Sequence, residues 1–130
     1  MEQQARHALY MTCLAGTGVQ VSLSQFKRHK EKETDVAIAA KLFEICYERS
    51  AESIVLVTGD TDLAPAVRLC QSLFADRTVV FAFPYNRLND ELRQLAPGSF
   101  KIKARTYFQN QFPDPLILRD GTIAAKPSSW

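Results

Sequence analysis

Two aspartates stand two residues apart directly after an apolar run, in the segment Ile54-Val-Leu-Val-Thr-Gly-Asp-Thr-Asp62. Carboxylates this close repel one another unless a cation or a proton neutralises them. Ligands that are all oxygen atoms favour a hard ion such as Mg²⁺ or Mn²⁺. The spacing of Asp60 and Asp62 therefore indicates a metal site, although an acid at this place is also typical of a residue that only caps the following helix.

A third acid, Asp35, precedes an apolar segment with helical spacing. Thr34 is predicted to cap that helix, which puts Asp35 in its first turn. If the helix start and the end of the strand lie at the same edge of a sheet, the three carboxylates converge. Such a cluster holds a metal ion that activates water and offsets the charge on a scissile phosphate. Taken alone, Asp35 is more often an ordinary first-turn acid.

The elements that must position these acids alternate between helices and strands. Apolar spacing predicts helices over residues 3–15, 34–48, 63–74 and 88–95, and strands over 19–23, 54–57, 78–83 and 100–102. The helix over 34–48 is apolar on two sides and is expected to be largely buried. The run over 54–57 is continuous and β-branched, which is typical of a strand covered on both faces. An α/β fold with a mainly parallel sheet follows, with its functional crevice beyond the carboxyl ends of the strands.

Length and composition are those of one globular domain, with 130 residues of which 46% are hydrophobic. The net charge of +2 does not predict nucleic-acid binding. The basic stretch Lys27-Arg28-His29-Lys30 is either a solvated loop or a patch that attracts phosphates.

The three cysteines (Cys13, Cys46 and Cys70) are widely spaced. They form no CxxC pair, so buried thiols in a reducing cytosol are expected rather than a zinc site. No segment approaches the ~20 apolar residues that span a bilayer. A cytoplasmic protein without a membrane partner is expected.

Two segments around the acids, Glu31-Lys-Glu-Thr-Asp-Val-Ala-Ile-Ala39 and Val55-Leu-Val-Thr-Gly-Asp-Thr-Asp-Leu-Ala-Pro65, resemble the core signature of NYN domains, which are relatives of PIN nucleases. Residues 6–26 are similar to the helix and strand that lead into this core. The tail is similar to that of one bacterial subgroup in Gln111-Phe-Pro-Asp-Pro115, Asp120-Gly121 and Lys126-Pro-Ser-Ser-Trp130. The resemblance covers nearly the whole chain, and its Thr-Asp-Val and Gly-Asp-Thr-Asp elements are moderately specific.

This resemblance implies a PIN-like three-layer α/β/α sandwich, with the NYN/PIN-like domain over residues 1–108 and a tail over 109–130 that packs on it. The implied activity is that of a metal-dependent ribonuclease, which hydrolyses phosphodiester bonds of RNA. The implied catalytic and metal-binding residues, which hold Mg²⁺ or Mn²⁺, are Asp35, Asp60 and Asp62. Substrate phosphates are expected near Lys30 and Lys32, with Thr58 and Thr61 supporting the carboxylates by hydrogen bonds. Glu31 is a weaker candidate.

The chain departs from the family's pattern at its beginning. Family members open with a strand that ends in an Asp ligand, and no Asp precedes Gln25 here. The fold is therefore expected to be N-terminally incomplete, with apolar strand edges exposed. Three explanations are open: a fragment of a longer protein, a sheet completed by a homo-oligomer or a partner chain, or a degenerate relative with weak or no catalysis.

Two other functions compete with the ribonuclease. One is a non-catalytic RNA- or protein-binding regulatory module of the same fold. The other is a phosphatase, since the strand-Asp-Thr-Asp element also looks like the nucleophile motif of haloacid-dehalogenase-like enzymes, with Asp60 as nucleophile and Asp62 as acid/base. That motif demands a later acidic pair at a strand end, and Pro84-Tyr85-Asn86 follows the strand over 78–83 instead. The RNA substrate, the cleavage specificity and the oligomeric state do not follow from the sequence.

Overall fold

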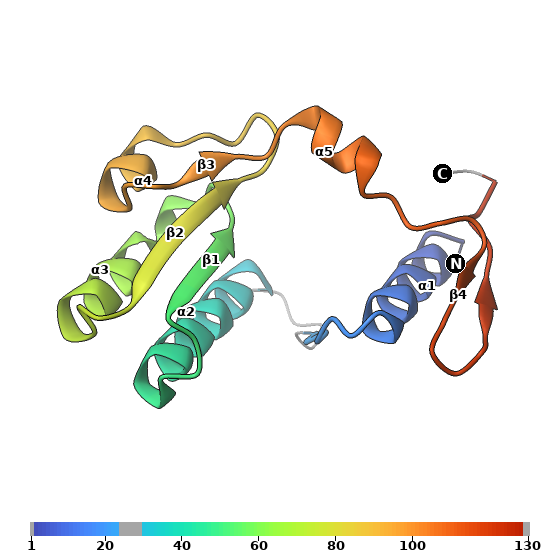
Figure 1. The fold of residues 1–130 in the computed structure, drawn as a ribbon, viewed down its shortest axis with the longest axis horizontal. Coiled ribbons are helices and arrows are strands. Elements are labelled where there is room, and N and C mark those ends of the chain that lie inside the picture. Colours follow the sequence, from blue (N-terminus) through green and yellow to red (C-terminus); the bar gives the residue numbers. More distant parts are fainter. Residues whose placement is uncertain (1, 24–29, 129–130) are drawn as a thin grey trace. The chain divides into compact units, whose positions relative to one another are not determined.

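The computed structural model describes residues 2–23 and 30–128. The chain forms two compact units (Figure 1). Unit 1 comprises Met1–Leu23 together with Asn110–Trp130, and unit 2 comprises Ser24–Gln109. Of the segment 109–130, expected to be a tail on the domain, all but Gln109 thus clusters with the first helix of the chain. The division into a domain over 1–108 and a tail over 109–130 remains a prediction.

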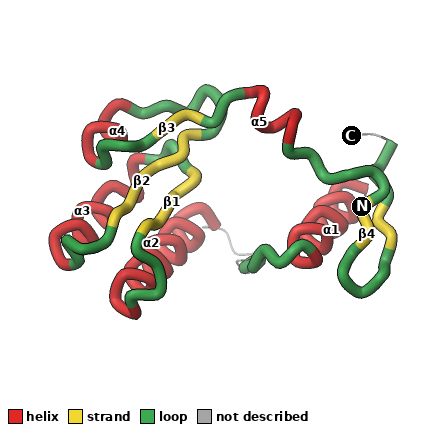
Figure 2. Tube along the Cα trace, viewed as in Figure 1, coloured by secondary structure: helices red, strands yellow, loops and turns green. Residues whose placement is uncertain are grey.

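Unit 2 alternates helices and strands (Figure 2). Its sheet has three strands, β1 (Ser53–Val57), β2 (Thr78–Phe83) and β3 (Phe100–Lys101). Its helices are α2 (Lys30–Glu48), the short 3₁₀ turn η1 (Thr61–Leu63), α3 (Ala64–Leu73), α4 (Asp90–Leu95) and α5 (Ala104–Gln109). All of these elements were predicted within a few residues except η1 and α5.

The sheet is parallel throughout, in the order β1-β2-β3. The β1–β2 register runs from Ser53 opposite Thr78 to Val57 opposite Ala82, and Ala82 pairs in turn with Phe100 of β3. Each parallel pairing needs a crossover, which α3 and α4 supply. The predicted α/β class with a parallel sheet is therefore confirmed, and the carboxyl ends of all three strands meet at one edge.

One core joins the helices to a single face of this sheet. Alternate strand residues point into it, among them Ile54 of β1 and Phe81 of β2. The helices contribute buried side chains to the same core: Leu42 and Cys46 from α2, Val67 and Cys70 from α3, and Leu92 from α4. The opposite face of β1 is open, because Val55 is 50% exposed and Val57 is 64% exposed. The expectation that this strand is covered on both faces is wrong for the described residues, since a continuous apolar run does not reveal how many of its faces find a partner.

The second helix also differs from its prediction. It begins at Lys30, so Thr34 lies inside α2 instead of capping it. Among the described side chains of α2, over residues 33–48, only Leu42 and Cys46 are buried, whereas Val36 is 67% exposed and Tyr47 is 72% exposed. The expectation of a largely buried helix is therefore wrong, because a single stripe of α2 faces the core and the other apolar side stays largely exposed.

The three cysteines are buried free thiols, as the sequence predicts. Cys46 and Cys70 face one another between α2 and α3. Burial, together with the neighbouring thiol of Cys46, raises the pKa of Cys70 to about 11. Cys70 therefore stays protonated at neutral pH and acts as an apolar part of the core.

Unit 1 consists of α1 (Glu2–Gly16) and an antiparallel hairpin of β4 (Leu116–Ile117) and β5 (Ile123–Ala124). Cys13 of α1 packs with Leu116 and Leu118 from the hairpin. Gly16 allows the two to approach, because a Cβ there would lie 2.7 Å from Leu118 Cδ2. The predicted helix is confirmed, and the strand predicted over 19–23 is wrong: that segment has no regular structure, since it pairs with no described strand. No helix in the described parts of the chain is long and apolar enough to cross a membrane.

Candidate metal centre

The loop that follows β1 holds Asp60 and Asp62 in a defined geometry. The backbone N–H of Asp60 donates to Thr58 Oγ1 at 3.1 Å. Asp60 is the N-cap of η1, and its Oδ1 accepts a hydrogen bond from the backbone N–H of Asp62 at 2.9 Å. The cap uses one of two carboxylate oxygens and leaves acceptor capacity for a further partner. Asp60 is thus a capping residue, as the simpler interpretation held, while its exposed carboxylate still faces the edge of the sheet.

Gly59 brings a second loop against this one. A Cβ at Gly59 would lie 2.3 Å from the carbonyl oxygen of Arg87 and 2.9 Å from its Cβ. Glycine is therefore required for the close approach of two backbones and not for a positive φ. Arg87 belongs to the turn after β2, where its N–H donates to Pro84 O at 2.9 Å. The loops that leave β1 and β2 are consequently in contact beside the acids.

Asp35 reaches the same place from α2. It is half-buried in the second turn of that helix, not in the first turn as predicted, and α2 is in contact with η1. Asp35, Asp60 and Asp62 each offer a carboxylate oxygen, and these oxygens lie within 4.8 Å of one another. The three acids therefore converge, as was expected on the condition that the two elements share a sheet edge, while Asp35 lies one turn later in its helix than predicted.

The donors suit a divalent cation of the hard type. All three are carboxylate oxygens, and three formal negative charges within 4.8 Å attract a cation strongly. Asp35, Asp60 and Asp62 could therefore hold one such ion between them, since each offers an oxygen within 4.8 Å of the other two.

The other predicted site residues are placed only in part. Thr58 supports the loop by accepting from Asp60, as expected, and Thr61 is exposed at the start of η1. The side chains of Lys30, Glu31 and Lys32 lie outside the described residues, as do residues 27–29 of the basic stretch.

One further residue beside the acids was missed by the sequence reasoning. Arg87 is exposed, and its backbone contacts the loop between Thr58 and Asp60. The available signal was its position shortly after the strand over 78–83, whose carboxyl end lies at the same sheet edge. A guanidinium here adds a cation that pairs well with phosphate oxygens.

Comparison with known proteins gave a family and a similar fold for most of the chain. The model of the family described as "NYN domain" matches residues 2–103. A solved structure of a protein of unknown function from Vibrio parahaemolyticus is similar in fold, with a TM-score of 0.62 and 21% sequence identity. The likeness covers 75% of this chain, which spans 61% of that protein's chain. The comparison with curated proteins gave no match.

Proposed function

Because the chain belongs to the NYN domain family of PIN-like nucleases, we propose that it is a cytoplasmic, metal-dependent ribonuclease with its active centre at Asp35, Asp60 and Asp62. The observation that carries the proposal is the convergence of three carboxylate oxygens within 4.8 Å, from α2 and from the loop after β1. Oxygen-only ligands favour Mg²⁺ or Mn²⁺ over softer metals. Exposure of Asp60 and Asp62 leaves the centre open to a polymeric substrate.

Residues of the chain would hold the metal ion and position the acidic loop for phosphodiester hydrolysis. A bound divalent ion supplies Lewis-acid activation of water and offsets charge on the scissile phosphate. Asp62 is held by its backbone bond to Asp60, and Thr58 fixes the backbone of Asp60 in turn. These hydrogen bonds keep the carboxylate of Asp60 and the backbone of Asp62 in place before substrate arrives, which lowers the cost of reorganisation during the reaction.

Cationic side chains are needed to hold the RNA backbone beside these acids. Arg87 adjoins the acidic loop, and its guanidinium is suited to bidentate contact with phosphate oxygens. Lys30 and Lys32 precede Asp35 on the chain, within the first turns of α2, and we assign them to phosphates farther along the strand.

A strand added beside β1 is a second part of the proposal. β1 is the edge of the described sheet, so the backbone groups on its outer side pair with no described strand, and Val55 and Val57 on its open face are largely exposed. Exposed apolar edges invite pairing with another chain. We assign this edge to a second copy or to a partner chain that completes the sheet.

Cleavage of RNA tests the main proposal. A mixed pool of single-stranded and structured RNA is incubated with Mn²⁺ and with EDTA, using the wild type and the double variant Asp60→Asn/Asp62→Asn. Asparagine at position 60 keeps an oxygen that accepts from the residue-62 amide, so the loop is retained while the charge is removed. Glu52→Gln is the matched control, because it removes an exposed charge at the opposite end of β1.

The proposal expects Mn²⁺-dependent cleavage by the wild type and the control, and none by the double variant. No cleavage by a well-folded wild type contradicts the proposal and favours the alternative, a non-catalytic RNA- or protein-binding module. Cleavage that survives in the double variant would place the active centre elsewhere.

A further inference from the structure

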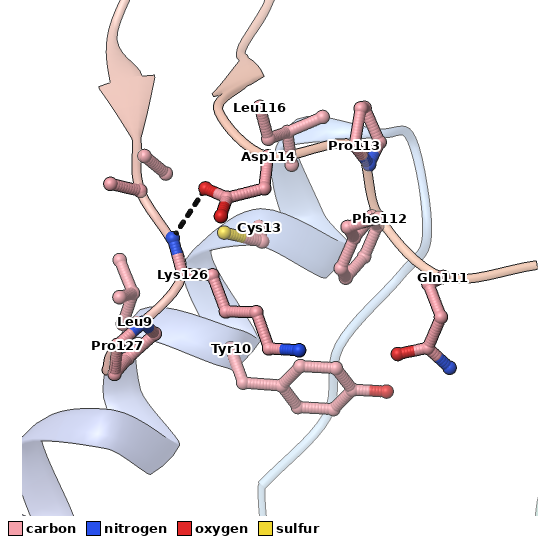
Figure 3. Close-up of a pocket in the computed structure, with 12 residues that line it drawn as sticks. Leu9, Tyr10, Cys13, Gln111, Phe112, Pro113, Asp114, Leu116, Lys126 and Pro127 are labelled. Atoms are coloured by element: carbon pink, nitrogen blue, oxygen red, sulfur yellow. Dashed lines mark hydrogen bonds between the residues drawn. The ribbon is translucent and has the colours of Figure 1, made fainter. Parts of the chain in front are cut away.

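Unit 1 contains a pocket of about 310 Å³ between α1 and the hairpin segment (Figure 3). Its floor is apolar and includes the side chains of Cys13 and Leu116, which belong to the core of the unit. Tyr10 and Phe112 line it and pack edge to face against one another, with ring centroids 6.0 Å apart and planes at 61°. Pockets of this size and character bind small planar groups, since an aromatic side chain offers a face on which a ring can stack.

Polar groups also line the pocket, and a purely aliphatic ligand could not form hydrogen bonds with them. Asp114 accepts a hydrogen bond from the backbone N–H of Lys126 at 2.9 Å, which leaves its second oxygen as an acceptor. In Figure 3 the ammonium of Lys126, the hydroxyl of Tyr10 and the amide of Gln111 lie on the same side of the pocket. Donors and acceptors around an aromatic slot match the edge of a nucleobase, which presents both.

A second hollow adjoins the first. It shares Tyr10 and Gln111 with the pocket, and Arg6 and His7 also line it. Its volume is about 550 Å³. A guanidinium and an imidazole beside an aromatic slot complement an anion that is attached to the group in the slot. The two hollows together therefore match a base joined to a phosphate.

We propose that unit 1 binds an unpaired nucleotide of single-stranded RNA, with the base in the pocket against Tyr10 and Phe112 and the phosphate beside Arg6 and His7. This inference rests on the proposed RNA function and adds a recognition site to it, formed by residues outside the acidic cluster. Bases in paired RNA are stacked within the helix and cannot enter such a slot, so the site selects single strands.

The test measures binding without cleavage. Fluorescence anisotropy in EDTA compares a short fluorescein-labelled single-stranded RNA with an oligonucleotide of equal length in which abasic sites replace the bases. The variants are Tyr10→Leu, which keeps apolar packing and removes the ring, and Lys126→Gln, which removes a charge at the rim. Phe108→Leu is the matched control, because Phe108 is 80% exposed on α5 in unit 2.

The wild type and Phe108→Leu are expected to bind the base-bearing strand roughly 5-fold to 150-fold more tightly than the abasic strand, the range that one base–aromatic stack produces. Tyr10→Leu should lose most of this preference, and Lys126→Gln should weaken binding of the base-bearing strand, because it removes the ammonium assigned to the base edge. Equal affinity of the wild type for the two strands overturns the inference, and so does a preference that persists in Tyr10→Leu. If Tyr10→Leu does not fold, as judged by circular dichroism, unchanged binding by Lys126→Gln overturns it instead.

The two proposals fail in different ways. Asp60-dependent cleavage together with binding that ignores Tyr10 refutes the nucleotide pocket alone. Binding that depends on Tyr10, without cleavage by the wild type, refutes the nuclease and retains the pocket.

Discussion

Replacing Asp60 by asparagine should make the metal-free protein more stable, although it removes a residue from the proposed active centre. The carboxylate of Asp60 lies within 4.8 Å of those of Asp35 and Asp62. In a water-like dielectric, two unit charges at this separation repel by about 1 kcal/mol. Loss of one charge relieves two such pairs, so the free energy of unfolding rises by up to about 2 kcal/mol at low salt.

The substitution keeps the local structure on which this magnitude depends. Asparagine is as good an N-cap as aspartate, and its side-chain oxygen can accept from the Asp62 amide as Asp60 Oδ1 does at 2.9 Å. Asp60→Ala removes this cap as well and should lose about 1 kcal/mol relative to Asp60→Asn. The two variants thus separate charge relief from the loss of a hydrogen bond.

Thermal unfolding followed by circular dichroism tests both effects. In low-salt buffer with EDTA, Asp60→Asn should melt above the wild type, and the difference should shrink as salt is added. Excess Mn²⁺ should stabilise the wild type by about 2.7 kcal/mol at a concentration one hundred times the dissociation constant, and it should leave Asp60→Asn unchanged.

Glu52→Gln serves as the control and should respond to Mn²⁺ as the wild type does. A lower melting temperature for Asp60→Asn in EDTA would refute the argument from repulsion. An equal response of both proteins to Mn²⁺ would refute the assignment of the ion to this cluster.

Gly59→Ala should destabilise unit 2 by about 1–3 kcal/mol in urea unfolding, because the added Cβ would lie 2.3 Å from the Arg87 carbonyl oxygen. The same variant should abolish cleavage. Unchanged stability would show that the two loops separate easily. Leu92→Ala, in the fully buried core, should lower the free energy of unfolding by about 2–5 kcal/mol by the same measurement, and a loss well below 1 kcal/mol would contradict the core described for α4. Folding raises the pKa of the Cys70 thiol to about 11 from an ordinary value near 9. The stability that the protonated thiol contributes is therefore complete below pH 9 and is lost as the pH rises through about 11. Across this pH window, the free energy of unfolding in urea should depend less on pH for Cys70→Ala than for the wild type. If β1 pairs with a second copy of the chain, light scattering should give the mass of a dimer for the wild type and of a monomer for Val57→Lys. A monomeric wild type would contradict pairing with a second copy and favour a different partner chain.

Local sequence pattern determined much of unit 2. The apolar runs of β1 and β2 and the spacing of α3 are properties of a few consecutive residues, and each was predicted nearly to its bounds. The position of Asp60 and Asp62 after a strand followed from the same local pattern. Asp35 lies on a helix, so the rule for strand ends did not place it; its meeting with the other two acids was expected only on the condition that the helix begins at the same sheet edge, and from the resemblance to NYN domains.

Tertiary structure alone decided which surfaces are covered and which backbones touch. A strand forms only where another strand pairs with it, so the alternating segment 19–23 remains irregular without a described neighbour. The exposure of Val55 and Tyr47 likewise depends on what packs against them and not on their own hydrophobicity.

Contacts between residues distant in the sequence also shape the acidic loop and the pocket of unit 1. Gly59 is required by the carbonyl oxygen of Arg87, and the pocket of unit 1 joins Tyr10 to residues about a hundred positions away. Sequence periodicity does not predict such contacts between distant residues. They result from tertiary packing, which removes apolar surface from water.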